Sequence, residues 1–495
     1  MVKMKMPRNI NRIFGAILIF FCFFSNLFPF LNIDLKIIIL TPQRMVPLLI
    51  SVWCLVIWGK RLYARQLAAE LKKRKFELIV FAFFCVWFIC GAVWMVLGEM
   101  NELVPAEVMG ILSICLYGFC LFTLTENNDD LHFFLKATLV CGMIMAVLAD
   151  IEIVVGSFVE GARYHYTLQE RISLGRSLFP PSVVFHNTND FAAFTLACLS
   201  LVAFRFINAR TKKEYAECVV IALLLLSPIP VINSTIFDLA FLVLLAVTLV
   251  FAGLCRDHSG VKKLSKCAGT VLFGFVYLLP FSMLMRTIGK GLNTAFFTAR
   301  ARAYLTQTST SPTVGADPTL PIPELTNPFV ENDVGMSDTL TSQITAAQAG
   351  YGTIHIRMWL IRAGLRFFSE SPIIGFGPGS FRVKMAENHD YREQTRGIVD
   401  PHNFYLELLV QYGGVMFLAY AAIVFYMLIA AFKKALGELK AGKAGNGVLT
   451  ILLLGTFSIA ALMPSGFIRL TAMWPFFLFA VLAFSRRNEQ QDAQT

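Results

Sequence analysis

The sequence has few charged residues, and its cysteines follow no recognisable spacing pattern. Only 15% of its 495 residues are Asp, Glu, Lys or Arg, whereas a soluble domain of average composition has roughly 25%. This deficit, together with a mean hydropathy of +0.64, excludes an ordinary soluble enzyme. The 11 cysteines include no CxxC pair and no Cys/His cluster with zinc spacing, so neither a disulfide framework nor a metal site is indicated. We expect these cysteines to pack as small hydrophobic residues.

Long apolar runs dominate the rest of the sequence. A membrane-spanning helix needs about 20 mostly apolar residues, and such runs recur along the chain. They predict an all-α polytopic membrane protein with about 12 transmembrane helices and a long, partly helical extracytoplasmic loop. The expected spans are residues 14–32, 45–59, 77–98, 106–125, 132–155, 191–207, 217–232, 235–255, 267–285, 413–432, 448–463 and 467–484.

Positive charge exceeds negative charge, with 43 Lys and Arg against 32 Asp and Glu and a formal net charge of +11. Such a balance can indicate nucleic acid. Most of these cations, however, lie in short loops between apolar runs, where topology and lipid headgroups account for them. The densest group is the seven within residues 60–75. The positive-inside rule therefore predicts a multi-pass protein with cytoplasmic N- and C-termini, membrane lipids as partners and no nucleic acid.

Two long segments fall on the outer side in this topology, residues 156–190 and 286–402. The second is far longer than an ordinary connection, and such loops are usually functional or disordered. The chain thus divides into an N-terminal transmembrane bundle (1–285), an extracytoplasmic loop (286–402) and C-terminal transmembrane helices (403–495). Within the loop, residues 353–369 have helical periodicity.

This loop helix is predicted to have one apolar face. At 100° per residue the face contains Ile354, Met358, Ile361, Leu365 and Phe368. Arg357 falls in the middle of that face, whereas Arg362 and Arg366 lie opposite, as does His355. A cation within an apolar stripe requires a buried anion, which makes Arg357 a candidate phosphate ligand. The alternative is an interfacial helix whose arginines contact lipid phosphates. The glycine-rich run at 375–379 is predicted to be a tight turn, since no strand precedes it.

A second group of candidate residues ends the long loop, in the run Asp400-Pro-His402-Asn403. Pro and Asn indicate the start of a helix, with Asn403 as its N-cap. His402 would then lie at the outer mouth of a membrane helix, where a neutral imidazole can take a proton from a sugar hydroxyl. The alternative is a surface histidine beside a helix cap.

The first outer segment contributes a third group. Arg171 and Arg176 can bind a phosphate through bidentate, charge-assisted hydrogen bonds. Asn187, Asn189 and Asp190 immediately precede an apolar span, so capping explains at least one of these three residues.

Four motifs occur in a fixed order along the chain. Phe-His-Asn-x-Asn-Asp-Phe-Ala at 185–192 follows an arginine. Arg-x-Trp at 357–359 precedes Phe-x-x-x-Pro-x-x-Gly-x-Gly-x-Gly-x-Phe at 368–381, and His-Asn-x-x-Leu-Glu-x-x-x-x-x-Gly lies at 402–413. Together they resemble the bacterial O-antigen ligase and O-antigen polymerase superfamily, and the first variant is similar to teichuronic-acid-type polymerases.

The resemblance implies glycosyl transfer on the outer face of a bacterial cell membrane. A glycan linked through diphosphate to a polyprenol would be the donor, and an acceptor sugar hydroxyl would attack its anomeric carbon, with no metal, cofactor or nucleotide sugar. His402 matches the family's loop histidine, the proposed base, and Arg176 matches its diphosphate-binding arginine. Arg171 and Arg357 are further candidates for the diphosphate. Asn403, Asn187, Asn189 and Asp190 are candidates for positioning the acceptor.

One position departs from the family pattern. Members often have Ser-Arg at the start of a mid-chain span, whereas this sequence has Thr235 where Arg is expected. Arg357 is therefore the candidate second ligand of the diphosphate.

Several functions stay open at this point. The motif variant favours polymerisation of cell-surface polysaccharide repeat units, whose partners would include a flippase and a chain-length regulator of the same pathway. Within the enzyme class, the alternative is an O-antigen ligase that transfers the glycan to a different lipid or wall acceptor. A lipid-linked glycan transporter would also have many spans and internal arginines, although transporters usually place their sites near the midplane on broken helices. The third alternative is a non-catalytic assembly subunit.

Overall fold

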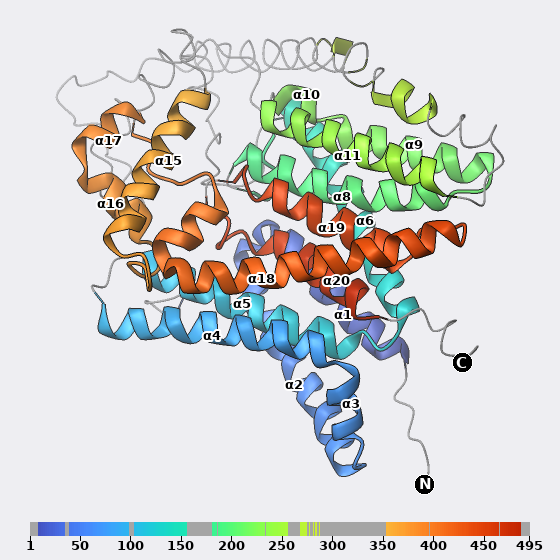
Figure 1. Cartoon of the computed structure of the whole chain (residues 1–495), viewed down its shortest axis with the longest axis horizontal. Coiled ribbons are helices and arrows are strands. Elements are labelled where there is room, and N and C mark those ends of the chain that lie inside the picture. The colour runs from blue at the N-terminus through green and yellow to red at the C-terminus, as the bar shows by residue number, and fades with distance from the viewer. Residues whose placement is uncertain are drawn as a thin grey trace, which may run out of the picture.

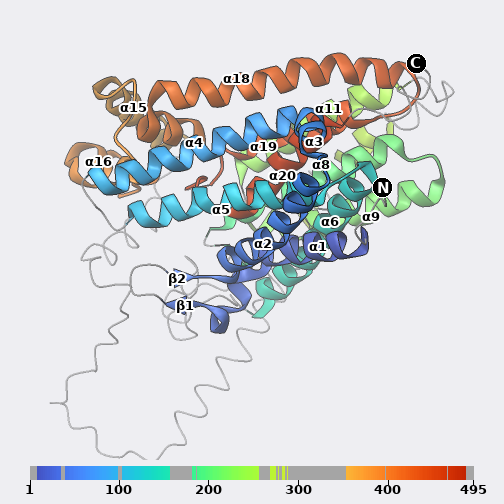
Figure 2. The same cartoon turned by 90° about the horizontal axis from the view of Figure 1, so that it is seen from below.

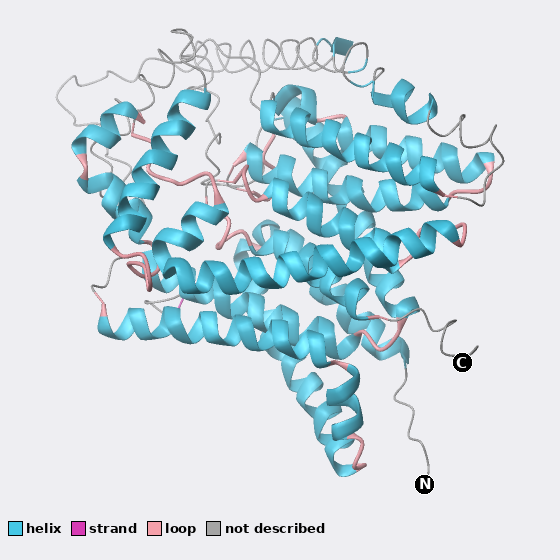
Figure 3. Ribbon diagram, in the orientation of Figure 1, coloured by secondary structure: helices cyan, strands magenta, loops and turns pink. Residues whose placement is uncertain are grey.

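The fold is described from a computed structural model of the whole chain. The structure describes residues 8–34, 39–98, 103–155, 181–185, 187–232, 234–255, 268–274 with five further positions up to 287, 353–395, 397–464 and 466–486. These residues are almost entirely helical (Figure 3). The exception is one antiparallel pair of two-residue strands, β1 (Ile33–Asp34) and β2 (Ile39–Leu40).

Most of the described helices follow one another through short connections; the exceptions are residues 156–187 and 255–352, most of which lie outside the described residues. The first half contains α1 (Arg8–Phe24), η1 (Ser25–Leu27), η2 (Pro29–Leu31), α2 (Pro42–Tyr63), α3 (Leu67–Lys73), α4 (Lys75–Leu97), α5 (Leu103–Leu124), α6 (Asn128–Val155), α8 (Thr188–Asn208), α9 (Lys212–Leu226), α10 (Ile229–Ile232) and α11 (Thr235–Leu254). The second half contains α15 (Thr353–Glu370), α16 (Ser380–Glu387), α17 (His389–Gln394), α18 (Phe404–Lys440), α19 (Asn446–Ala460), η4 (Thr471–Met473) and α20 (Trp474–Ser485).

Nine helices within the described residues are long and apolar enough to cross a membrane, and α19 and α20 are shorter apolar helices. A helix satisfies its own backbone hydrogen bonds, which is what a chain must do inside hydrocarbon. The prediction of an α-helical membrane protein is therefore confirmed. The number of 12 spans stays a prediction, because one expected span, 267–285, is described only in part.

The long helices lie side by side and alternate in direction, so their ends form two opposite faces (Figure 1). One face contains α15–α17 and the start of α18; we call it the His402 face. The other contains the start of α1, the end of α18 and the end of α20; we call it the terminal face. Figure 2 shows α18 running most of the length of the bundle beside the shorter α4, with α15 and α16 at one end.

An aromatic core fixes where α18 begins. Phe404, its first residue, is fully buried and lies 5.7 Å from the Trp474 ring of α20, which in turn lies 5.7 Å from Trp87 of α4. Phe457 of α19 packs on the same Trp474 ring at 5.4 Å. Aromatic pairs at such distances add to the free energy of simple burial. The residue two positions before this anchor, His402, is therefore held against the bundle.

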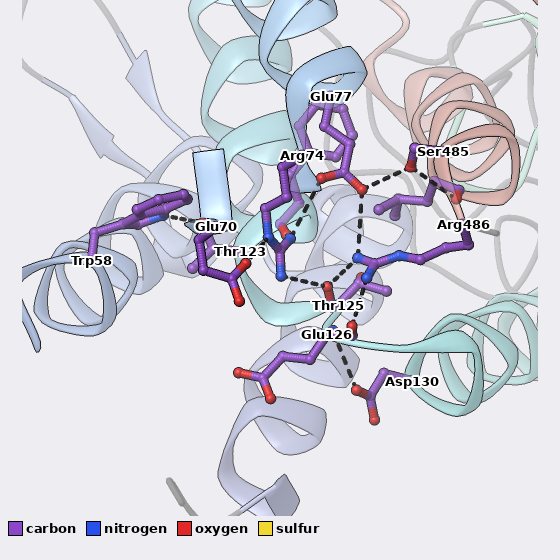
Figure 4. Close-up of polar contacts among 12 residues, drawn as sticks. Trp58, Glu70, Arg74, Glu77, Thr123, Thr125, Glu126, Asp130, Ser485 and Arg486 are labelled. Carbon is purple, nitrogen blue, oxygen red and sulfur yellow. Dashed lines mark hydrogen bonds and ion pairs between the residues drawn. The ribbon is translucent and has the colours of Figure 1, made fainter. Parts of the chain in front are cut away.

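A network of buried charges closes the terminal face (Figure 4). The Glu77 carboxylate lies between two guanidinium groups, 3.6 Å from Arg74 and 3.5 Å from Arg486. Both arginines also donate to the backbone carbonyl of Thr125 at the end of α5. The network thus joins α4, α5 and the end of α20. Buried charges are tolerated where they are paired and hydrogen-bonded in this way.

Helix α15 covers the residues for which the periodicity predicted a helix, but the predicted apolar face is not the face that packs on the bundle. Met358, Ile361 and Leu365 are 50%, 41% and 53% exposed, whereas the stripe that packs inward contains Leu360, Ala363 and Phe367. The reason is steric. Gly364 lies so close to Leu406 of α18 that a Cβ would overlap its side chain, so the face with small residues packs against the bundle. Helix α15 therefore has two apolar faces, and Arg357 lies on the flank between them.

Candidate functional site

Asn403 begins α18 as the sequence predicts. Its backbone is extended, with φ −160° and ψ 106°, and its side-chain oxygen accepts from the backbone N–H groups of Tyr405 and Leu406 at 3.0 and 3.3 Å. This cap satisfies two of the N–H groups that a helix start leaves without partners. The same role at α8 belongs to Asn187, which accepts from the Asn189 N–H at 3.0 Å.

His402 itself has a left-handed backbone, with φ +47°. Few residues other than glycine adopt this conformation, and it is maintained only where the surroundings hold it. Two contacts do so. Arg357 Nη1 donates to the His402 carbonyl at 3.3 Å, and the imidazole Nδ1 lies 3.5 Å from the carbonyl oxygen of Met463. Strain at a histidine beside a helix cap is the kind of feature found at functional sites.

The Arg357 guanidinium also contacts the connection between α19 and η4. The same Nη1 donates to the Leu462 carbonyl at 2.6 Å. Burial lowers the pKa of Arg357 from its usual value, but an arginine side chain stays protonated in proteins. Arg357 thus brings a half-buried positive charge beside His402. Its partners are carbonyl oxygens, which are weaker ligands than a phosphate.

Two more arginines form ion pairs with Asp400 of the same loop. The Asp400 carboxylate lies 3.1 Å from Arg382 Nε of α16 and 3.6 Å from Arg469 Nη2, which comes from the connection between α19 and η4. The two arginine side chains are 31% and 30% exposed. They are therefore within reach of a solute as well as of Asp400. Arg357, Arg382 and Arg469 thus approach residues 400–402 from three separate segments.

Two buried carboxylates lie under this cluster. Glu407 of α18 accepts from the Phe467 N–H at 3.1 Å, and Glu107 of α5 accepts from the Gly379 N–H at 2.9 Å. Both also interact electrostatically with Arg469. These bonds fix the two segments that provide Arg469 and Arg382. Backbone N–H donors of this kind satisfy a buried carboxyl group, which would otherwise be costly to bury.

The glycine-rich run forms the predicted tight turn and interlocks with a break in α18. Gly375, Gly377 and Gly379 all have positive φ, of +71°, +89° and +72°. Gly413 interrupts α18 with φ 74° and ψ 179°. A Cβ at Gly413 would overlap the backbone of Ile373. Only glycine allows two backbones to approach so closely.

The turn replaces the hydrogen bonds that the break removes. In a regular helix the N–H groups of Gly414 and Val415 would donate to the carbonyls of residues 410 and 411. Here they donate to Pro372 and Ile373, at 2.8 and 3.4 Å, while residues 410 and 411 accept from residues 376 and 377 at 3.1 and 2.8 Å. Each of these four backbone groups of α18 therefore has a hydrogen-bond partner, as the interior of a membrane requires.

The remaining sequence candidates are only partly placed. Asn187, Asn189 and Asp190 lie at the start of α8 on the His402 face, where α8 packs against η4. Arg171 and Arg176 lie outside the described residues. Thr235 begins α11, with Ser234 as its cap residue.

Sequence reasoning missed Arg382 and Arg469. Arg469 had a usable signal, because it is a single cation in the apolar run around the last expected span, and an ionisable residue in such a run is a functional candidate. Arg382 had none, since its approach to Asp400 depends on how the glycine turn orients α16.

Comparison with known proteins finds no protein-family model that matches the chain and no matching curated protein. The assignment of function therefore rests on the residues and their geometry.

Proposed function

We propose that the protein is a membrane glycosyltransferase whose donor is a glycan linked through diphosphate to a polyprenol, and that transfer occurs at the His402 face. One observation carries the proposal. His402 is held in a left-handed conformation at the start of a membrane helix, while Arg357, Arg382 and Arg469 approach its loop from three segments. A base beside fixed cations is what such a transfer requires.

In this proposal His402 acts as the base. A carbonyl oxygen can only accept, so the Met463 carbonyl near Nδ1 favours the tautomer with the proton on Nδ1. Nε2 then has a lone pair that can take the proton of the acceptor hydroxyl. The hydroxyl oxygen forms a bond to the anomeric carbon as the bond from that carbon to the diphosphate oxygen breaks. The electron pair of that bond leaves with the polyprenyl diphosphate.

The arginines would stabilise the diphosphate. Negative charge develops on the leaving oxygen in the transition state, and guanidinium groups already in place stabilise it without reorganisation. Arg382 and Arg469 are suited to this role because they share one carboxylate, Asp400, and are partly exposed. A diphosphate offers them more acceptor oxygens than Asp400 does. Arg171 and Arg176, expected ligands from the sequence, would add to this set.

The acceptor decides between polymerase and ligase. The motif at 185–192 favours polymerisation of repeat units, and transfer to a different lipid or wall acceptor is the alternative within the same chemistry. A flippase and a chain-length regulator are the proposed pathway partners.

The break in α18 at Gly413 favours a transporter as a second candidate, because transporters use broken helices to coordinate substrates and ions. The four backbone groups at this break, however, bind the turn at residues 372–377. They are therefore engaged by the protein itself, which favours the enzyme.

The test is to incubate the purified protein in proteoliposomes with lipid-linked repeat units and to separate the products by size. A ladder of longer glycans is the expected result, and transfer to another lipid would identify a ligase. Movement of the donor across the bilayer without a new glycosidic bond would refute the enzyme and identify a transporter.

A further inference from the structure

Helix α15 presents an apolar face that no described element covers. Met358, Ile361 and Leu365 are between 41% and 53% exposed, and they lie on the side of α15 opposite the stripe that packs inward. Single exposed apolar residues need no explanation, but an apolar stripe on one face of a helix indicates an interaction surface.

The apolar surface continues onto α18. Ile373 and Ile374, just beyond the end of α15, are 65% and 61% exposed. The carbonyl of Ile373 accepts from the N–H of Val415 at 3.4 Å. Val415 and Leu418 are themselves 63% and 65% exposed on a helix apolar enough to span a membrane. The exposed face of α15 is therefore linked to a surface that lipid must cover.

Cationic and aromatic groups border this face on one side. The Arg362 guanidinium lies over the Trp359 ring, 5.1 Å from its centroid, and Arg366, one turn further along, is exposed and also forms a side-chain hydrogen bond with Tyr391 of α17. Tryptophan and arginine side chains with an apolar body and a polar end are enriched at the depth of lipid headgroups. Figure 1 shows α15 steeply inclined to the long helices, across the end of the bundle.

We infer that α15 lies in the plane of the membrane surface on the His402 face. Met358, Ile361 and Leu365 are buried at the edge of the lipid hydrocarbon, and Arg362 and Arg366 contact lipid phosphates. The partner is a phospholipid leaflet. The continuity with α18 favours lipid over a second copy of the chain or over residues 289–352, which precede α15 in the sequence.

This placement has a consequence for the site. Arg357 lies on α15 between the inward and the lipid-facing stripes and reaches His402 from there. The membrane surface would thus set the depth of the candidate site at the level of headgroup phosphates. The inference does not depend on the proposed transfer reaction, because it rests on the exposed residues alone.

Fluorescence quenching in lipid nanodiscs tests the depth of α15. Leu365→Cys, and Met358→Cys as a second variant, would each be labelled with an environment-sensitive fluorophore. The discs contain phosphatidylcholine and phosphatidylglycerol with a nitroxide on either the acyl chain or the headgroup. The matched control is Gln394→Cys on α17, an exposed residue on the helix that packs against the inward side of α15. Labelling of the parent chain measures the background from native cysteines.

The expected result is acyl-chain quenching at Leu365 and Met358 about twofold or more above that at Gln394. Arg366→Cys should show the reverse preference, with stronger quenching by the headgroup nitroxide. Equal quenching at Leu365, Met358 and Gln394 would overturn the inference. Protection of Leu365 from both nitroxides and from a water-soluble quencher would also overturn it, because it would place protein over the stripe. Neither result depends on transferase activity.

Discussion

At the scale of single residues, the arginines of the His402 face differ in what they contact. Arg357 donates to two backbone carbonyls and fixes the loop, whereas Arg382 and Arg469 share a carboxylate and are partly exposed. Arg362 lies over an aromatic ring at the lipid-facing side of α15. These different contacts predict different losses of activity or donor binding when each arginine is replaced.

Arg357→Ala should lower turnover by at least about tenfold, because a hydrogen bond from a charged group contributes about 1.5–3 kcal/mol and two are lost. His402 would then be free to leave its left-handed conformation. Arg362→Ala, on the same helix, is the matched control and should keep most of the activity. The measurement is the transfer rate at equal protein level, and a greater loss in Arg362→Ala would contradict the role of Arg357.

Arg469→Ala should weaken donor binding and turnover together, since the diphosphate is present in both the donor and the transition state. Arg469→Lys should recover part of each, because one ammonium group cannot replace a planar guanidinium. The control is Arg205→Ala. Arg205 lies near the end of α8, and its exposed side chain pairs with Glu217. The measurement is the affinity of each variant for a fluorescent lipid-linked donor. Unchanged affinity in Arg469→Ala would remove this residue from the diphosphate site.

At the scale of elements, the break in α18 and the glycine turn form one unit. Each supplies the hydrogen-bond partners that the other lacks. This unit positions α16, and with it Arg382, above the buried Glu107.

Gly413→Ala should destabilise the protein, because the residue has φ +74° and its Cβ would overlap the backbone of Ile373. The cost should exceed about 2 kcal/mol of unfolding free energy, given that a left-handed non-glycine residue alone costs about 1–3 kcal/mol. Gly437→Ala, on the same helix with no atom near the added Cβ, should change little. Thermal melting in detergent compares the two, and equal melting temperatures would show that the interlock is not needed.

Local signals in the sequence were enough for some of these elements and not for others. The cap at Asn403, the helix at α15 and the glycine turn follow from residue type and spacing over a few positions. The inward face of α15 does not, because it depends on the fit of Gly364 against Leu406. Likewise Arg382 and Arg469 come together only through Asp400, 18 and 69 positions from it along the chain. Contacts across such separations have no local signature.

For the whole molecule, the proposed transfer requires the His402 face to be extracytoplasmic. The supporting feature is charge, since the short helix α3 and its neighbours on the terminal face contain the densest cations in the chain. The buried Arg74–Glu77–Arg486 network lies at that same face. Cationic loops are retained on the cytoplasmic side.

Cysteine labelling in intact cells tests this orientation. With a membrane-impermeant thiol reagent, Gln394→Cys should be labelled, whereas Ala69→Cys and Ala441→Cys, both exposed on the opposite face, should be labelled only after permeabilisation. The parent chain gives the background from native cysteines. Labelling at Ala69 in intact cells would reverse the topology and place the candidate site in the cytoplasm.

If His402 is the base, a variant that keeps its backbone conformation but has no basic side chain should release polyprenyl diphosphate only slowly from a lipid-linked donor. His402→Asn is suited to this, because asparagine tolerates the left-handed conformation at φ +47° but cannot take the proton. The release rate of His402→Asn should be lower by about 10²–10⁴-fold, with donor affinity nearly unchanged. His402→Ala should lose at least as much. Release at a near-normal rate in His402→Asn would show that His402 is not the base, which would then have to lie elsewhere.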